Sequence, residues 1–290
     1  MPTTPSPLRY PGGKTAYAPM LRQIIQDNKI NGCDYVEPFA GGAGAALTLL
    51  LSKSVNAIWL NDLDVAIYSF WKAVIDYTDD FINKLWNTPI SIVEWKKQRK
   101  IYKNEKEDIL LLGFATLYLN RCNRAGILSA NPVGGITPYL NRSKYRIWAR
   151  FNRQSLTNKI ETIANLKDRI NLSNEDARIF LARFHTYNKN VLVYFDPPYF
   201  QKGSLLYMNS LKNSEHCALS HLIRQCKYKW LLSYDDQPRI RELYADINMY
   251  RKKRLNYSVT APSIGMELVI SPLKKMPQDL EPVIFSDTAG

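Results

Sequence analysis

Short apolar runs and longer apolar stripes alternate along both ends of the chain. Residues 35–39 and 57–60 are short, apolar and bounded by turn residues, which predicts two strands. The apolar stretch 45–52 between them predicts a helix. Strands separated by helices are typical of an α/β doubly wound sheet. The alternation returns later in the chain, where we expect strands at 169–172, 191–195, 230–233 and 267–271, and helices at 176–186, 215–227 and 238–244.

The middle of the chain has little strand character. Ser91 is a candidate N-cap with Glu94 three residues later, which is the pattern of a capping box. A polar loop, 121–143, is rich in Asn, Gly and Pro. Apolar spacing predicts helices at 65–86, 92–103, 108–120 and 145–166. We therefore predict one discontinuous α/β domain (1–66 and 169–276), a helical, basic insertion (67–168) and a loose tail (277–290).

The net charge favours a polyanionic partner. The chain of 290 residues contains 39 Lys and Arg against 26 Asp and Glu, a formal net charge of +13. Such an excess favours nucleic acid, although charge alone also fits a solvated basic surface. No apolar run approaches the ~18 residues of a membrane span, and the first ten residues lack the apolar core of a signal peptide. Four scattered cysteines without a CxxC pair predict free thiols in a reducing cytosol and no metal site.

Two glycine turns suggest a ligand site. Gly41, Gly42 and Gly44 lie between a predicted strand and a predicted helix, and Asp62 ends the next strand. Glycines let the backbone pass close to a ligand, and a strand-end acid can hold ribose hydroxyls. The spacing differs from the usual dinucleotide fingerprint, so a nucleotide-like cofactor is the broader expectation. Upstream, PGGK places Lys14 on a second such turn.

The run VLVYF at 191–195 leads directly into Asp196-Pro197-Pro198-Tyr199. Because the run is apolar on both faces, it predicts a central buried strand. In open α/β sheets, ligands bind at the carboxyl ends of the strands. The prolines fix φ and aim the preceding carbonyls outward. A carboxylate and a fixed carbonyl could accept both N–H bonds of a nucleobase amino group while Tyr199 stacks on the base. An electrophile such as a sulfonium methyl could then react, although a purely structural turn also fits.

These motifs together resemble the Dam-type adenine-N6 DNA methyltransferases. The resemblance is carried by RYPGGK, FAGGAG, the acid in NDLD, and DPPY, and it covers about residues 8–273. In this group the cofactor motif precedes the catalytic motif, with the target-recognition region between them. The resemblance implies a Rossmann-like methyltransferase sheet in which 1–66 and 169–276 bind S-adenosylmethionine and 67–168 recognises DNA.

The resemblance also implies roles for individual residues. Asp62 would hold the ribose hydroxyls of the cofactor, and Asp176 would contact its adenine. Asp196, Pro197, Pro198 and Tyr199 form the implied catalytic set. The implied cofactor-binding set is Tyr10, Gly12, Lys14, Phe39, Gly41, Gly42, Asp62, Asp176 and Asp196.

The basic insertion supplies the candidate DNA contacts. Lysines and arginines of 92–103 and 142–159 suit phosphates, whereas Asn and Arg of the loop 121–143, Asn120 included, suit base edges. Ser129 stands where the family usually has an arginine, so a GATC target does not follow from the resemblance. The expected DNA-binding residues are Lys96, Lys97, Lys100, Arg121, Asn123, Arg124, Asn131, Arg142 and Arg146.

The leading hypothesis is a cytoplasmic, bacterial or phage-encoded enzyme that transfers a methyl group from S-adenosylmethionine to N6 of a flipped-out adenine in double-stranded DNA. The same chemistry on RNA or on cytosine N4 is an alternative, and so is a catalytically silent DNA-binding relative. A dinucleotide-dependent oxidoreductase would leave DPPY and the basic insertion unexplained. No membrane contact is expected. A cognate restriction endonuclease and the oligomeric state stay open.

Overall fold

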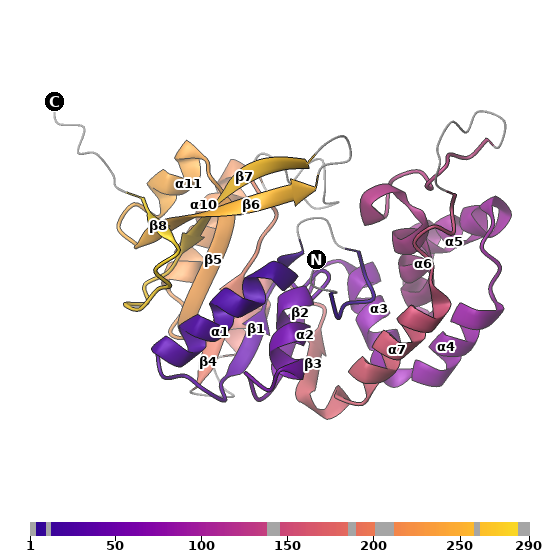
Figure 1. Cartoon of the computed structure of the whole chain (residues 1–290), viewed down its shortest axis with the longest axis horizontal. Coiled ribbons are helices and arrows are strands. Elements are labelled where there is room, and N and C mark those ends of the chain that lie inside the picture. The colour runs from indigo at the N-terminus through magenta and orange to yellow at the C-terminus, as the bar shows by residue number, and fades with distance from the viewer. Residues whose placement is uncertain are drawn as a thin grey trace. The chain divides into compact units, whose positions relative to one another are not determined.

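The computed structural model describes residues 4–9, 13–137, 146–184, 190–200, 212–257 and 262–283. Its strands hydrogen-bond in the order β3-β2-β1-β4-β5-β7-β6-β8. Helices separate most of the strands along the chain (Figure 1). The predicted α/β class is therefore confirmed, with a mainly parallel sheet and flanking helices.

The contacts within the chain define two compact units. We call the first the helical unit; it comprises Met1–Ala16, Ala40–Thr48 and Leu60–Glu175. We call the second the strand unit; it comprises Tyr17–Phe39, Leu49–Trp59 and Asp176–Gly290. The predicted division into a catalytic domain and a target-recognition insertion concerns function and stays a prediction.

The strand unit is built around β4 (Val191–Phe195), whose five residues are all buried. It runs parallel to β1 (Asp34–Glu37) and to β5 (Lys229–Asp235), which explains its unbroken apolar sequence. β7 (Pro262–Ile270) lies antiparallel to β5 and to β6 (Met249–Tyr257). The remaining elements of this unit are α1 (Ala18–Asp27), α8 (Ala177–Phe184), α10 (Asn213–Arg224), α11 (Pro238–Leu243) and β8 (Glu281–Pro282).

The helical unit is a bundle in which α6 (Ile109–Cys122) is the central helix (Figure 1). It packs on α3 (Val65–Asp76), α4 (Thr78–Asn87) and α5 (Ile92–Asn104). A helix that is apolar around its whole circumference has to be enclosed by neighbours, and α6 is buried along most of its length. The unit also contains η2 (Arg124–Gly126), α7 (Arg153–Ala164), η4 (Lys167–Arg169) and β3 (Ile170–Ser173).

Three elements carry the chain from one unit into the other, and the first is η1 (Lys14–Tyr17). α2 (Gly44–Leu51) begins in the glycine loop, and β2 (Ile58–Asn61) follows it. Strand, glycine turn and helix occur in the predicted order, with boundaries shifted by one or two residues. The strands predicted at 169–172, 191–195, 230–233 and 267–271 also occur, as β3, β4, β5 and β7.

Three local predictions need correction. The stretch 65–86 forms two helices rather than one, because the chain leaves helical geometry at Tyr77. Helix α7 begins at Arg153 and not at 145, since Asn152 caps it by accepting the Ser155 N–H; the described residues before it form turns. The tail predicted to be loose from 277 contributes β8, which pairs with β6.

The capping box at α5 is half confirmed. The Ser91 hydroxyl accepts the Glu94 N–H at 3.1 Å, as predicted. The reciprocal bond differs: the Ser91 N–H donates to the Tyr118 hydroxyl, and the Glu94 carboxylate accepts from the Gln98 side chain. The start of α5 is therefore tied to the buried helix α6 through Tyr118.

Replacing Gly113 by alanine should destabilise the fold. A Cβ there would lie 2.5 Å from the Ser69 carbonyl oxygen and 2.9 Å from Ala73 Cβ, so α3 and α6 would have to separate. Overpacking typically costs about 1–3 kcal/mol, against a gain of about 0.5–1 kcal/mol from replacing a helical glycine. We expect Gly113→Ala to lower the free energy of unfolding in a denaturant titration. Ser155→Ala, at an exposed position of α7, is the control; a more stable Gly113→Ala protein would contradict the close helix contact.

Candidate active site and nucleic-acid interface

Within the helical unit, both backbone polar groups of Gly41 are hydrogen-bonded to side chains. Its N–H donates to Asp62 Oδ2 at 2.8 Å, and its carbonyl accepts the indole N–H of the buried Trp71 at 2.9 Å. Gly41 has φ +47° and Ala43 has φ +46°, a backbone region that side chains disfavour. The glycine loop is therefore a fixed structure, set by the acid after β2 and by a tryptophan of α3.

Asp62 is the best-supported candidate for a cofactor ligand. It follows β2 directly, and its Oδ1 accepts the Asp64 N–H at 2.9 Å. Burial raises the pKa of Asp62 to about 6, although the N–H groups of Asp64 and Gly41 act in the opposite direction. An isolated carboxylate is costly to bury. The position of Asp62 therefore disfavours the charged form of its carboxyl.

Thr15, which follows the second glycine turn, packs on the first. A Cβ on Gly44 would lie 2.3 Å from Thr15 Oγ1 and 3.3 Å from the Thr15 nitrogen. A larger residue at position 44 would therefore require the Thr15 side chain to move. Lys14, at the start of η1, is buried. Of the residues predicted to bind cofactor on this turn, Tyr10 and Gly12 lie outside the described residues, and so does Pro11.

In the strand unit, the Asp196 carboxylate is oriented by the neighbouring strand β5. The buried Ser233 hydroxyl donates to Asp196 Oδ1 at 2.9 Å. Ser233 Oγ also lies 2.8 Å from the Tyr194 hydroxyl. A serine has one hydroxyl proton, so Tyr194 must be the donor to Ser233. Burial and the charge of Asp196 hold the pKa of Tyr194 well above its usual range, so this proton is retained.

The residues after the two prolines are anchored as well. The Tyr199 hydroxyl donates to Glu267 Oε1 at 2.5 Å, and the Phe200 N–H donates to Asp235 Oδ1 at 3.0 Å. The Tyr199 ring lies 6.2 Å from the Tyr234 ring, and the Phe200 ring lies 5.1 Å from His216. The whole turn is thus held by β5, β7 and α10.

Phe39 and Asp176 are the two remaining cofactor candidates of the strand unit. Phe39 packs against the core of this unit, half-buried. Asp176 precedes α8, and its carboxylate binds the Arg178 guanidinium through two contacts of 2.8 Å. This ion pair lowers the pKa of Asp176, so the carboxyl is ionised at neutral pH. Arg178 would have to be shared or displaced for Asp176 to contact an adenine.

Most of the predicted DNA contacts of the helical unit are exposed cations or amides. Helix α5 turns Trp95, Gln98 and Tyr102 inward, and this leaves its other face to the lysines. The exposed members of the predicted set are Lys96, Lys97, Lys100, Arg124, Asn131 and Arg146, whereas Arg142 lies outside the described residues.

Asn120 and Asn123 have structural roles instead. Asn120 donates to the carbonyls of Arg9 and Gly126 and accepts the Arg9 N–H at 2.7 Å. Asn123 is fully buried; it donates to the carbonyls of Ile127 and Leu128 and accepts from Trp95. Both side-chain amides donate their N–H groups to backbone carbonyls of the chain, so neither supports the predicted base contact.

Arg121 lies in a group of cations at the end of α6. Burial lowers the pKa of Arg121 to about 10, and the charges of Arg9 and Arg150 act in the same direction. Its Nε is buried and makes no hydrogen bond with the residues that the structure describes. Lys159 belongs to the same group: burial and the charge of Arg121 lower its pKa. Cations that repel one another in this way favour an anion as their ligand.

Sequence reasoning missed the residues that hold the candidate side chains in place. Trp71, Ser233 and Glu267 lie in segments predicted as core helices or strands, whereas Asp235 and Tyr17 lie outside the predicted elements. The sequence signal for three of the five was the polar residues within otherwise apolar runs, as in LLSYDD and GMELVIS. Polar residues that a buried strand retains need partners, and here the partners lie in the turn after β4.

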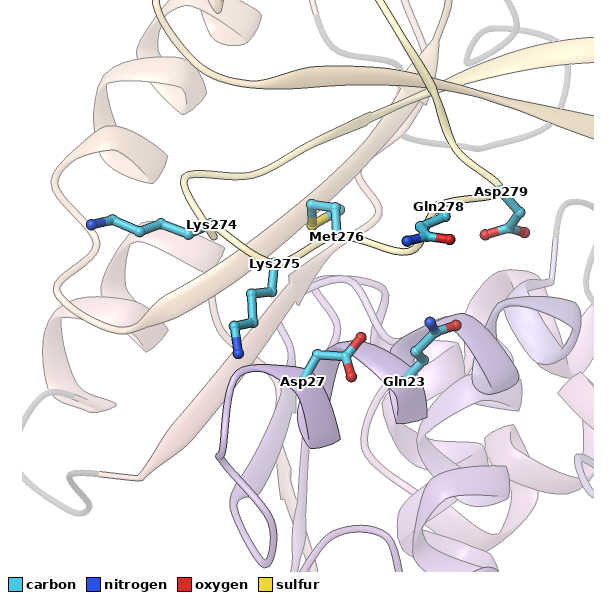
Figure 2. A pocket seen from close by; sticks show the side chains of 7 residues that line it. All are labelled: Gln23, Asp27, Lys274, Lys275, Met276, Gln278 and Asp279. Carbon is cyan, nitrogen blue, oxygen red and sulfur yellow. The ribbon is translucent and has the colours of Figure 1, made fainter.

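A pocket of ≈ 640 Å³ lies elsewhere in the strand unit (Figure 2). Gln23 and Asp27 of α1 line one side of it, and Lys274, Lys275 and neighbouring residues of the segment 274–279 line the other. No residue that the sequence predicts for catalysis, cofactor or DNA lines this pocket. It therefore has no part in the candidate site.

The mainly parallel sheet with flanking helices, the glycine loop and the Asp-Pro-Pro-Tyr turn after a central strand together define a Rossmann-like methyltransferase. A family model of the D12 class N6 adenine-specific DNA methyltransferases matches residues 10–257. The chain belongs to this family, whose members are S-adenosylmethionine-dependent enzymes that methylate adenine in DNA. A comparison with curated proteins gives no match.

A separate structural finding concerns membranes. In the part of the chain that the structure describes, no helix has the length and apolar character to cross one.

The ionisation of Asp62 can be measured directly. We expect its carboxyl to titrate near pH 6 instead of the ordinary 3.8, because burial disfavours the charged form. The stability that this group contributes should be full below about pH 4 and should be lost as the pH rises through about 6. Carbon-detected NMR of labelled carboxyls would follow the titration, with Asp62→Asn to assign the signal. A titration near pH 4 would contradict this environment.

Proposed function

We propose that this chain binds S-adenosylmethionine with the glycine loop and Asp62 and methylates the N6 amino group of an adenine that has been flipped out of double-stranded DNA. The observation that supports this most strongly is the anchored Asp196–Tyr199 turn at the end of the central strand β4. A rigid turn with a carboxylate and an aromatic ring suits a planar, amino-bearing base.

The residues around Asp62 fit this cofactor. Each carboxylate oxygen offers about two acceptor positions, and each Asp62 oxygen accepts one backbone N–H. Acceptor capacity is therefore left for ribose hydroxyls. The Gly41 peptide, fixed by Asp62 and Trp71, presents a backbone without a side chain, which permits close approach of a ligand. Lys14, Gly42, Phe39 and Asp176 complete the proposed set, together with Tyr10 and Gly12.

When held by the glycine loop and Asp62, the cofactor would supply an electrophilic sulfonium methyl for the N6 lone pair of the adenine. Asp196 and the Pro197 carbonyl accept the two amino N–H bonds and orient the nitrogen. The proton that N6 loses leaves through the Asp196 carboxylate to water. Ser233 holds Asp196 during this step, so the chain contributes by positioning and electrostatics.

The exposed lysines of α5 and the cations of the loop favour duplex DNA as the substrate. Lys96, Lys97 and Lys100 are exposed on one helix, and an array of this kind contacts phosphates. N6 is inaccessible to a turn of this kind while the base is stacked, so the base has to be extruded and received by the Tyr199 ring. Arg124, Asn131 and Arg146 are the exposed candidates for further contacts, and the Arg121 group is a candidate for a phosphate.

Replacing Asp196 by alanine should abolish methyl transfer and leave DNA binding intact. The carboxylate acts on the amino group in the transition state, so we expect the rate to fall by about 10³-fold or more. The assay incubates the protein with labelled S-adenosylmethionine and unmethylated genomic DNA, then maps N6-methyladenine by sequencing. Asp246→Ala, which removes an exposed aspartate paired with Arg224, is the matched control. Undiminished turnover in Asp196→Ala would refute the proposed chemistry.

Replacing Lys96, Lys97 and Lys100 together by alanine should weaken DNA binding and flatten its salt dependence. Each lost phosphate contact reduces the slope of log K against log salt by about 1. We therefore expect a slope that is smaller by up to about 3 in a fluorescence-anisotropy titration.

The matched control for that experiment is a second triple variant with the same change of net charge. Lys227, Lys274 and Lys275 are exposed lysines of the strand unit, and their replacement by alanine should leave the slope unchanged. Equal slopes in both triple variants would remove α5 from the interface.

A further inference from the structure

Glu267 is a buried acid in the middle of β7, and no cofactor or DNA role accounts for it. Its side chain is only 4% exposed. A buried carboxylate is costly unless donors satisfy it. Two tyrosine hydroxyls do so: Tyr199 donates to Oε1 at 2.5 Å, and Tyr17 donates to Oε2. All three residues belong to the strand unit.

The hydrogen bond from Tyr199 is of the strong, charge-assisted kind. Bonds of hydroxyls to carboxylates are typically about 2.5–2.7 Å long and roughly twice as strong as neutral ones. Burial, Asp196 and Glu267 hold the pKa of Tyr199 well above its usual range, so the hydroxyl keeps its proton and stays a donor. Glu267 therefore holds the hydroxyl end of the Tyr199 side chain, and the backbone turn holds its other end.

A second acid supports the same turn from the neighbouring strand. Asp235 and Glu267 are direct register partners in the antiparallel pair of β5 and β7. Like charges opposite each other in a sheet are destabilising. The turn supplies a donor to each of them, from the Phe200 N–H to Asp235 and from the Tyr199 hydroxyl to Glu267. The two acids and the turn are thus mutually dependent.

A cation lies on the other side of Glu267. Lys252 of β6 is its register partner, and the Lys252 ammonium lies 5.6 Å from the centre of the Tyr17 ring. Tyr17 is buried and immediately precedes α1, so its hydrogen bond to Glu267 connects the carboxylate to the start of this helix. The Glu267 carboxylate thus joins the catalytic turn to β7 and to the start of α1.

We propose that Glu267 is a positioning residue, which holds the Tyr199 ring in the orientation that stacks on the target base. The proposal rests on the proposed function, since the base is the one methylated by the Asp196 turn. Glu267 acts through Tyr199, and Tyr17 holds the carboxylate of Glu267 in turn. Loss of the contact should free the ring and slow the reaction without weakening the attachment to DNA.

The test compares Glu267→Ala, Glu267→Gln and Tyr199→Phe with the wild-type enzyme. Three quantities are measured for each protein. They are the single-turnover rate of methyl transfer, the Kd for DNA, and the fluorescence of 2-aminopurine placed at the adenine that the wild type methylates. Formation of N6-methyladenine by the wild type tests the proposed function by itself, so the variants test only the positioning role. Glu242→Gln, an exposed glutamate paired with Arg239, is the matched control.

We expect Glu267→Ala and Tyr199→Phe each to slow methyl transfer by about tenfold or more, the effect of losing one hydrogen bond to a charged group. Kd should change by less than about twofold, while the altered stacking changes the 2-aminopurine signal. Glu267→Gln should recover part of the rate, because its amide oxygen still accepts the Tyr199 hydroxyl. Glu242→Gln should match the wild type.

The double variant Glu267→Ala/Tyr199→Phe gives the sharpest outcome. Both changes remove the same hydrogen bond, so the combined loss should be smaller than the product of the two single losses. Independent, multiplying losses would overturn the proposal, and so would a wild-type rate in Tyr199→Phe. Should Glu267→Ala fail to fold, as judged by thermal unfolding, Glu267→Gln and Tyr199→Phe decide the question, since each leaves the buried volume filled.

Discussion

The two prolines after Asp196 impose the constraint on which the turn after β4 depends. Pro197 and Pro198 have no N–H group, so the chain beyond β4 cannot be held by ordinary backbone donors at these positions. Side chains of the neighbouring strands take over: Ser233 binds Asp196, Asp235 binds the Phe200 N–H, and Glu267 binds the Tyr199 hydroxyl. A turn with two consecutive prolines is thus held by buried polar residues of β5 and β7.

The glycine loop is held by the same principle in the helical unit. Gly41 has a donor and an acceptor, and both are bound by side chains of later elements, Asp62 and Trp71. Because Asp62 also receives the Asp64 N–H, one carboxylate shapes the loop and the start of α3. Its raised pKa follows from this position, since a group that organises buried backbone is itself withdrawn from water.

The sequence was sufficient for most elements, because Asp196 and Asp62 stand at the ends of short apolar runs and glycines mark the turns. It was insufficient for some helix boundaries: the chain leaves helical geometry at Tyr77, and the Asn152 cap starts α7 at Arg153. It was also insufficient where a partner far along the chain decides the outcome. Asn123 is suited to an adenine edge by type, yet Trp95 and two loop carbonyls use its amide.

The anchoring acids also resolve an electrostatic difficulty. An enzyme that binds a polyanion has to bury carboxylates without repelling its substrate. Asp235 and Glu267 accept hydrogen bonds from the turn, Lys252 lies beside Glu267 in register, and burial disfavours the charge on Asp62. Their negative charge is therefore largely compensated inside the chain. The net charge of +13, with exposed lysines on α5, favours a polyanionic partner.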